Sequence, residues 1–226
     1  ICHFSNKMHI PVVVDNTFAT PLLQKPLKLG ATLSLTSTTK YINGHSDALG
    51  GAVCTESTVW RDKLNFAQKA LGLNPSPFDC WLITRGIKTL PLRLERQISN
   101  ASKIANQLAD NPAIKSVRYP FRSDHPQCKL AQRQMAKGGA VVTATINANQ
   151  AKTYSFCKSL HYFKMAESLG GIESLVCHPA TMTHASVPKE IKLKIGITDS
   201  LIRFSVGCEN IEDLIGDLNQ ALEIIS

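Results

Sequence analysis

Short apolar runs separated by turns occupy the first quarter of the chain and predict a sheet. One β-branched run covers 11–14 and ends at Asp15, a second run rich in Thr, Leu and Ser covers 31–37, and a third covers 48–54. Runs this short and apolar fit buried strands better than helices, because a helix needs a longer periodic stretch. The first run is typical of a strand buried in a parallel sheet.

Apolar residues at spacings of three and four predict a long amphipathic helix over 87–108. Pro91 favours a start or a bend of the helix, and Asn111 with Pro112 favours its end. We read this helix as the connector between two domains. Other predicted elements are a helical turn over 27–30 closed by Gly30, a helix over 61–71 closed by Gly72, a helix over 130–137, a strand over 140–146, a helix over 150–160, a strand over 201–206 and a terminal helix over 211–225. This mixture after the connector predicts an α+β domain with a small sheet covered by helices on one side.

The composition is that of an ordinary globular protein. The 226 residues are 43% hydrophobic and 19% charged, enough for one large domain or for a medium and a small one. No apolar stretch approaches about 18 residues and no basic-then-apolar leader opens the chain, so we expect a cytoplasmic protein with no membrane partner. Because the chain begins at Ile1 rather than at Met, we expect a piece of a longer protein.

The seven cysteines stand singly, so neither a disulfide framework nor a Cys-x-x-Cys metal site is expected. Several lie in apolar runs, as Cys54 does after Val53, and we interpret them as small buried hydrophobic residues in a reducing cytoplasm. His178 and His184 flank Pro179 at a spacing that suits a metal ion poorly, so no metal site is predicted.

The net charge of +8, with a pI near 9.2, raises the question of a nucleic-acid partner. The basic residues are spread out, and only Lys189, Lys192 and Lys194 form a loose cluster. No aromatic residues alternate with them in the manner of a nucleic-acid motif. An enzyme that binds small anionic ligands accounts for the charge as well, so we expect no nucleic-acid partner.

Polar residues follow the first two predicted strands, at the ends where open α/β sheets build ligand sites. Asp15 ends the first strand, and Ser37, Thr39 and Lys40 follow the second. Taken singly, the Asp is typical of a turn and the Lys of a solvated surface. Together they supply what a pyridoxal cofactor requires: a lysine for its aldehyde, an acid for its ring nitrogen and hydroxyl donors for its phosphate.

Six segments resemble the cysteine/methionine metabolism family of pyridoxal-phosphate-dependent enzymes. In chain order they are VDNTFATP at 14–21, STTKYINGHSD at 37–47, RGIKTL at 85–90, ESLGGIESL at 167–175, MTHA at 182–185 and LIRFSVG at 201–207. The resemblance covers nearly the whole chain in the right order. It is closest to cystathionine γ-synthase and cystathionine γ-lyase.

The resemblance implies a role for each candidate in the first part of the chain. Lys40 would hold pyridoxal 5'-phosphate as a Schiff base, Asp15 would pair with its ring nitrogen, and Ser37 and Thr39 would contact its phosphate. Thr36 stands where many family members carry His. We expect little effect from this departure, because the hydroxyl donors and the lysine are kept.

The resemblance also implies where an amino-acid substrate would bind. Arg203 would grip the substrate α-carboxylate, a task that suits the guanidinium fork, and the backbone around Ser168 and Leu169 would line the site. Glu167 would pair with the distal ammonium of cystathionine or of incoming cysteine. The simpler interpretation of Glu167 is a solvated loop residue.

The fold that the resemblance implies is α/β, the aspartate-aminotransferase-like fold of PLP-dependent transferases (fold type I), here lacking its N-terminal part. Residues 1–91 would be the C-terminal part of the large cofactor-binding domain, and 92–226 the small α+β domain. Family members form homo-oligomers, typically homotetramers. The missing part would supply an aromatic residue that stacks on the cofactor, a phosphate-binding turn and residues lent to a neighbouring subunit.

The activity that the resemblance implies is γ-replacement or γ-elimination on sulfur amino acids. Cystathionine would be formed from an activated homoserine ester and cysteine, or cleaved to cysteine, 2-oxobutyrate and ammonia. An acidic residue before Ser-Leu-Gly, here Glu167, is typical of the γ-synthases and γ-lyases. The alternatives are a cystathionine β-lyase, a methionine γ-lyase, a homoserine-ester sulfhydrylase, or an inactive fragment that retains only structural or oligomer contacts.

Overall fold

The computed structural model describes residues 1–225, which divide into two compact units. The first unit consists of 1–91 together with 134–136, and the second of 92–133 together with the described chain from 137 onward. Among residues 1–225, no helix has both the length and the apolar character that a membrane span requires.

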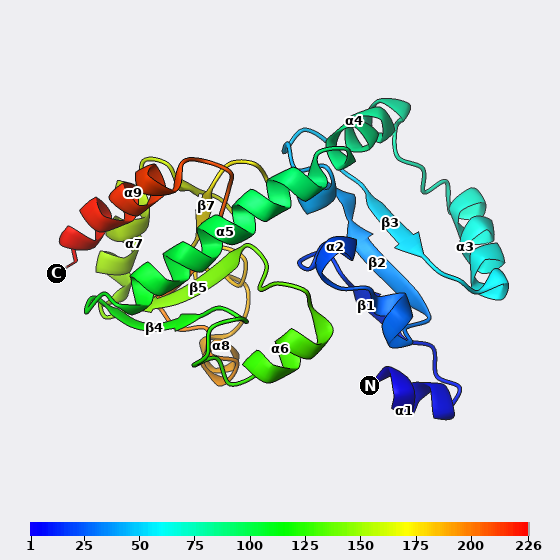
Figure 1. Ribbon diagram of the computed structural model, residues 1–226, viewed down its shortest axis with the longest axis horizontal. Helices are drawn as coiled ribbons and strands as arrows, with labels where there is room; N and C mark the ends of the chain where they lie inside the picture. The colour runs from blue at the N-terminus through cyan, green and yellow to red at the C-terminus, as the bar shows by residue number, and fades with distance from the viewer. Residues whose placement is uncertain (226) are drawn as a thin grey trace. The chain divides into compact units, whose positions relative to one another are not determined.

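A three-stranded sheet forms the middle of the first unit (Figure 1). Strand β1 (Val13–Asp15) pairs in parallel with β2 (Leu33–Ser37), and β2 pairs antiparallel with β3 (Gly51–Cys54). The prediction of three strands at these positions is confirmed. Because β1 and β2 are parallel, their carboxyl ends meet at one edge of the sheet, where Asp15 and Ser37 lie.

The prediction that the first strand is buried is wrong. Val13 is 55% exposed, and Leu35 and Val53, which the strand register places on the same face, are 36% and 41% exposed. The described residues cover only part of this face: Leu33, which pairs with Val13, is buried, whereas the other apolar side chains remain in contact with solvent.

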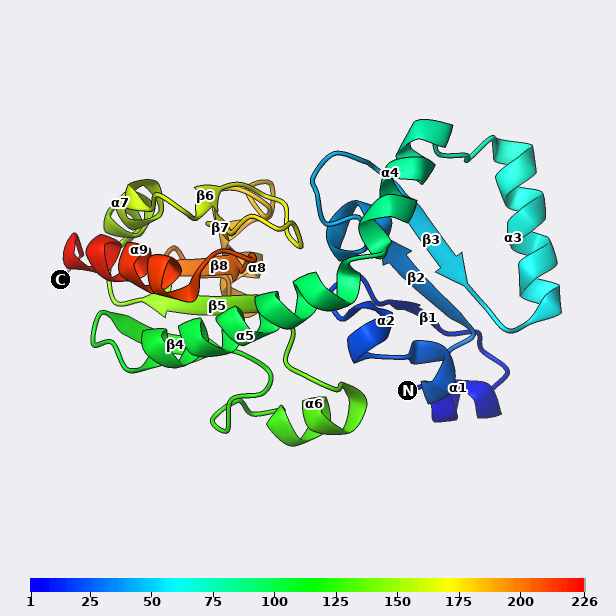
Figure 2. The same cartoon turned by 45° about the horizontal axis from the view of Figure 1, so that its top comes forward.

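The other elements of the first unit are helical. They are α1 (Cys2–Lys7), α2 (Thr20–Leu23), a 3-10 turn (Pro26–Leu29), a π-helical turn (Thr38–Ile42), α3 (Thr58–Leu71) and α4 (Pro77–Ile87). The predicted ends at Gly30 and Gly72 are confirmed, and both glycines adopt left-handed backbone angles, with φ of 90° and 66°. Helix α3 buries no residue and lies apart from the sheet in both views (Figures 1 and 2). Helix α4 was not predicted.

The second unit contains a five-stranded sheet in the order β4-β5-β8-β7-β6. The strands are β4 (Ile114–Arg118), β5 (Val141–Ile146), β6 (Lys164–Met165), β7 (Leu175–Cys177) and β8 (Leu201–Ser205), and the helices are α5 (Leu90–Ala109), α6 (Cys128–Gln134), α7 (Gln150–Ser159), α8 (Lys189–Lys194) and α9 (Ile211–Glu223). All neighbouring strands are antiparallel except β6 and β7. Strands β5 and β8 and helices α5, α7 and α9 lie close to their predicted positions, although α5 begins at Leu90 rather than at 87.

One face of this sheet is buried and the other is only partly covered. In β5 the residues alternate between buried and intermediate, and in β8 Ile202 and Phe204 are fully buried whereas Arg203 between them is not. Phe204 contacts the rings of Phe156 and Phe163 edge to face. The apolar stripes of α5 and α9 are also buried, as expected for a small sheet covered on one side.

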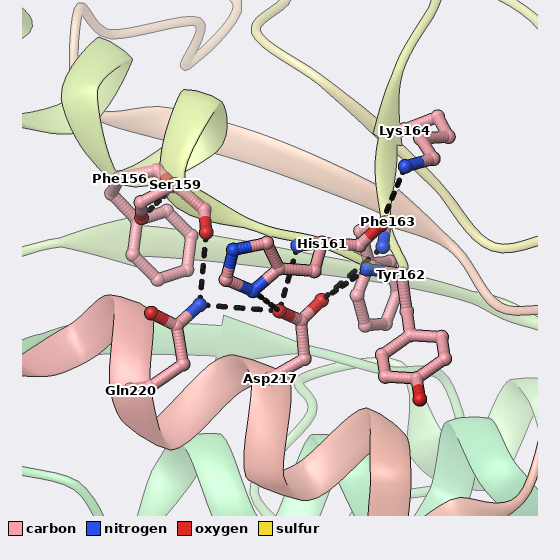
Figure 3. A network of polar contacts seen from close by, with 8 residues as sticks. All are labelled: Phe156, Ser159, His161, Tyr162, Phe163, Lys164, Asp217 and Gln220. Carbon is pink, nitrogen blue, oxygen red and sulfur yellow. Dashed lines mark hydrogen bonds and ion pairs between the residues drawn. The ribbon is translucent and has the colours of Figure 1, made fainter.

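A buried carboxylate on α9 holds the loop that follows α7 (Figure 3). Asp217 is 5% exposed and accepts hydrogen bonds from the backbone N–H groups of His161, Tyr162 and Phe163, at 2.7, 2.8 and 3.3 Å. Gln220 donates both to Asp217 Oδ1 and to the Ser159 carbonyl oxygen. The backbone N–H groups of this turn do not pair with a neighbouring strand, so the Asp217 carboxylate provides the acceptors they need.

The cysteines of the described chain differ in exposure. Cys128, Cys157 and Cys177 are buried, whereas Cys54 and Cys80 are exposed, so the interpretation as buried residues is wrong for these two. Cys54 ends β3 and lines a cavity on the face opposite to Val53. Burial, with a smaller contribution from the thiol of Cys177, raises the pKa of Cys157 to about 12.

Candidate active site

A threonine hydroxyl connects the ends of β1 and β2. Asp15 Oδ1 accepts hydrogen bonds from Thr17 N at 3.0 Å and from Thr17 Oγ1 at 2.6 Å. The same Thr17 Oγ1 accepts the backbone N–H of Ser37 at 2.8 Å. The predicted cofactor acid and the segment that carries the predicted cofactor lysine are therefore joined through one side chain.

Lys40 lies in the π-helical turn that follows β2. The backbone departs from helical geometry at this residue, with φ of −90° and ψ of −129°. The turn is held by hydrogen bonds from Asn43 N to Thr38 O at 3.0 Å and from Gly44 N to Lys40 O at 2.8 Å. Lys40 itself is half-buried. The turn thus presents the lysine directly beyond the carboxyl end of β2.

Gly86 allows α4 to pack closely against this turn. A Cβ at position 86 would overlap the backbone carbonyl of Asn43, three residues after Lys40. Asn43 is 1% exposed, and its side-chain amide donates to Asp47 Oδ1 at 2.8 Å. His45 Nδ1 lies 2.7 Å from Asn43 O, so His45 and Asp47 stabilise the turn. The RGIKTL segment therefore has a structural reason for its glycine, which the sequence analysis did not provide.

The two hydroxyls predicted to contact phosphate differ in their surroundings. Thr39 Oγ1 accepts the N–H of Gly50 at 3.0 Å and donates to the Gly50 carbonyl at 3.3 Å, so it already stabilises the start of β3. Ser37 is half-buried, and its backbone N–H is the group held by Thr17. The Ser37 hydroxyl is thus the better placed of the two to serve a ligand without losing an internal bond.

A cavity of about 540 Å³ lies on the other face of the same sheet. Ser34, Thr36, Ala52 and Cys54 line it from β2 and β3, and its lining includes neither Asp15 nor Lys40. Thr36 therefore faces this cavity rather than the predicted cofactor site.

In the second unit, Arg203 holds the loop that contains three predicted substrate residues, Glu167, Ser168 and Leu169. It comes from β8, and its Nη2 donates to the carbonyl oxygens of Glu167 and Ser168 at 3.1 and 3.3 Å. Arg203 Nε is buried and makes no hydrogen bond among the described residues. Leu169 is buried, whereas the Glu167 side chain points into solvent. The Arg203 Nε has almost no solvent-accessible area, so a ligand does not reach it directly.

Two residues that sequence reasoning missed support this loop. Ser205, two positions after Arg203 on β8, accepts the N–H of Gly170 at 2.9 Å. Gln97 on α5 donates to the carbonyl oxygen of Gly171 at 2.6 Å and is fully buried. The segments LIRFSVG and ESLGGIESL are thus joined by hydrogen bonds, which explains why both belong to one signature.

The other candidate chemistry is structural. His178 is fully buried, with Nδ1 2.8 Å from Thr181 Oγ1 and Nε2 2.9 Å from the carbonyl oxygen of Asp199. Within residues 1–225, no group of three or more His, Cys, Asp or Glu side chains is arranged to hold a metal ion. His178 therefore serves to join two loops.

The residues present fit pyridoxal phosphate. In the first unit, an oriented carboxylate and a lysine lie at the ends of adjoining strands. In the second unit, the half-buried guanidinium of Arg203 lies beside the backbone of Glu167 and Ser168.

The fold is that of the pyridoxal-phosphate-dependent enzymes. A family model described as "Cys/Met metabolism PLP-dependent enzyme" matches residues 1–223, so the chain belongs to this family. The predicted family is confirmed, and the predicted cofactor, pyridoxal 5'-phosphate, is the one on which the family depends.

Relatives with different reaction names are about equally similar to the chain. It is 48% identical to a cystathionine β-lyase of Lactococcus lactis over 211 residues, 93% of this chain and 55% of that protein. It is 48% identical to a cystathionine γ-lyase of Bacillus subtilis over 221 residues, 98% of this chain and 58% of that protein. A cystathionine γ-synthase of Mycobacterium tuberculosis is 47% identical over 211 residues, 93% of this chain and 54% of that protein.

Solved structures confirm the predicted fold class. A cystathionine γ-synthase of Xanthomonas oryzae pv. oryzae, in complex with aminoacrylate and cysteine, superposes with a TM-score of 0.96 at 44% identity. The match covers 99% of this chain and 58% of that one. The chain therefore spans a little over half the length of the relatives it matches.

Proposed function

We propose that this protein binds pyridoxal phosphate through Lys40 and catalyses γ-replacement or γ-elimination on sulfur amino acids. The observation that carries the proposal is the hydrogen-bonded link from Asp15 through Thr17 to Ser37, which unites the acid and the lysine segment at one sheet edge. The relatives named cystathionine γ-synthase and γ-lyase support the reaction class. On this proposal, residues 1–91 bind the cofactor and 92–226 contribute to the substrate site.

On the cofactor side, each residue has one task. Lys40 would hold the cofactor through its aldehyde, and the Ser37 hydroxyl, with Thr39 beside it, would hold the phosphate. Asp15 uses Oδ2 to pair with the ring nitrogen, because both described hydrogen bonds of its carboxylate fall on Oδ1. When bound, the pyridoxal ring supplies an electron sink for the charge that develops on the substrate.

On the substrate side, the half-buried guanidinium of Arg203 binds the α-carboxylate. Once the substrate amine has taken its place on the cofactor, the freed Lys40 amine would be the base that takes the proton from the substrate Cα. The backbone at Ser168 and Leu169 lines the site, and Arg203 holds this backbone through the carbonyl oxygens of Glu167 and Ser168. One arginine thus both binds the substrate and shapes the loop beside it.

A product assay tests the proposal. The enzyme is given an activated homoserine ester with cysteine, and separately cystathionine alone, and the amino acids and 2-oxo acids formed are identified. Formation of cystathionine marks a γ-synthase, and release of 2-oxobutyrate marks a γ-lyase. Lys40→Ala should abolish turnover and keep the fold, and turnover by this variant would refute the proposal. Release of pyruvate from cystathionine would assign a β-lyase instead.

Glu167 is the residue on which the choice of substrate depends. Its side chain is exposed, as a group that meets a distal ammonium of a long substrate should be. Glu167→Gln, which keeps the shape and removes the charge, should raise the KM for cystathionine about tenfold, the effect of losing one charge-assisted bond, and leave methionine turnover unchanged. Equal losses on both substrates would contradict a role in recognition.

We also propose a cytoplasmic homo-oligomer. The first unit exposes Phe66, Leu73 and Trp81 to 74%, 65% and 59%, more large apolar surface than a monomer usually leaves uncovered. All seven cysteines are free, as in a reducing compartment. Light scattering coupled to size-exclusion chromatography measures the mass, and a monomer would refute the oligomer.

A further inference from the structure

The two partners of Thr17 Oγ1 determine the direction in which its hydroxyl donates. The backbone N–H of Ser37 is a donor, so Thr17 Oγ1 accepts there and must direct its own hydrogen elsewhere. The remaining partner is Asp15 Oδ1, 2.6 Å away, a distance typical of a hydroxyl that donates to an ionised carboxylate. The Thr17 hydroxyl therefore donates to Asp15 Oδ1.

Asp15 depends on these bonds for its orientation. It is exposed, it is the last residue of an edge strand, and two donors of Thr17 converge on its Oδ1. Two bonds to one oxygen fix the rotation of the carboxylate and leave Oδ2 to face a ligand. Without the hydroxyl, a single backbone N–H at 3.0 Å would remain to orient it.

The same hydroxyl fixes the start of the lysine segment. Ser37 is the last residue of β2, three positions before Lys40, and its N–H points to Thr17 Oγ1. Thr17 is 7% exposed, so water competes little for either bond. Movement of Ser37 away from Asp15 would therefore break a shielded hydrogen bond.

We propose that Thr17 is a positioning residue that couples the cofactor acid Asp15 to the segment bearing the cofactor lysine Lys40. Thr17 touches neither substrate nor cofactor in this role. It sets the angle of the carboxylate and the separation of the two strand ends, so that the ring nitrogen and the aldehyde of one cofactor are held together. This inference rests on the proposed function, because it assigns Asp15 and Lys40 to the same ligand.

Titration of the apoenzyme with pyridoxal 5'-phosphate tests the coupling, followed by the absorption band of the bound cofactor. Thr17→Val keeps the shape and removes the hydroxyl, and should weaken cofactor binding at least about tenfold and change the band, since one bond to a charged group is lost. Thr17→Ser keeps the hydroxyl and should restore both. A Thr17→Val enzyme with unchanged affinity and band would overturn the inference.

A second pair of variants separates the loss of the hydroxyl from an effect of misfolding. Thr17→Ala and Thr17→Ser both lose the methyl group and differ only in the hydroxyl, so equal cofactor affinities for these two would also overturn the coupling. Wild-type enzyme that binds no pyridoxal phosphate would refute the proposed function instead. A cofactor-binding wild type with an unaffected Thr17→Ala would refute only the role of Thr17.

Discussion

Replacement of Asp217 by Ala should destabilise the second unit by about 3–5 kcal/mol, since a hydrogen bond to a charged acceptor contributes about 1.5–3 kcal/mol. The estimate counts the two short bonds, from His161 N at 2.7 Å and Tyr162 N at 2.8 Å, and gives little weight to the longer one from Phe163 at 3.3 Å. The Asp217 side chain is 1% exposed, so water cannot readily take its place.

Urea unfolding of the wild type and the variant measures this difference. Asp213→Ala is a matched control, because Asp213 is an exposed carboxylate on the same helix and its loss should cost less than about 1 kcal/mol through the helix dipole. Amide hydrogen exchange at Tyr162 and Phe163 should accelerate in Asp217→Ala only. Equal stabilities of the two variants, or unchanged exchange, would refute the claim that Asp217 holds this loop.

Three further predictions concern close packing and buried titratable groups. Gly86→Ala should lower the free energy of unfolding, measured in urea, by about 1–3 kcal/mol through overpacking against Asn43, and should weaken cofactor binding. Gly216→Ala in α9 is the control, because a Cβ there meets nothing within 4 Å and should not destabilise the protein. Equal effects of the two substitutions would contradict the close packing at Gly86. Cys157, with a pKa of about 12, should resist alkylation in the native protein and react after unfolding, and rapid native labelling would contradict its burial. Burial raises the pKa of Tyr119 from 10.0 to about 12, so its contribution to stability should be present below pH 10 and lost as the pH rises through 12. Tyr119→Phe should reduce the loss of stability at alkaline pH, and an unchanged pH profile would contradict this role of Tyr119.

The elements that sequence patterns predicted well have strong local signals. Gly30 and Gly72 end their helical elements because both adopt positive φ, which glycine tolerates best. Helix α5 follows from its long apolar stripe. Helix α4 was missed, although Ser76 followed by Pro77 is a helix-start signal and the Ser76 hydroxyl does accept the N–H of Asp79.

Burial and hydrogen bonds between distant residues could not be predicted in the same way. The apolar character of Val13 indicated a strand, but whether a layer covers that strand depends on residues elsewhere in the structure. The roles of Thr17 and Ser205 depend on strand register, since their partners are 20 and 35 positions away. Strand β6 has only two residues, too few for any periodic pattern.

The predicted site residues were found through their resemblance to a family signature, and the structure adds the physical links between them. Asp15 is joined to Ser37 through a hydroxyl, and Arg203 is joined to the Ser168 loop through carbonyl oxygens. No spacing rule connects these pairs, because each spans two elements whose pairing is set by the whole sheet. Within each unit, hydrogen bonds set by the strand pairing hold these signature segments together.

The most direct test of the account is to identify the residue that carries the cofactor. The holoenzyme is reduced with borohydride, digested and mapped by mass spectrometry. We predict that the pyridoxyl group is attached to Lys40, within the turn Thr38–Ile42. Attachment to any other lysine, or a protein that carries no cofactor at all, would contradict the central claim.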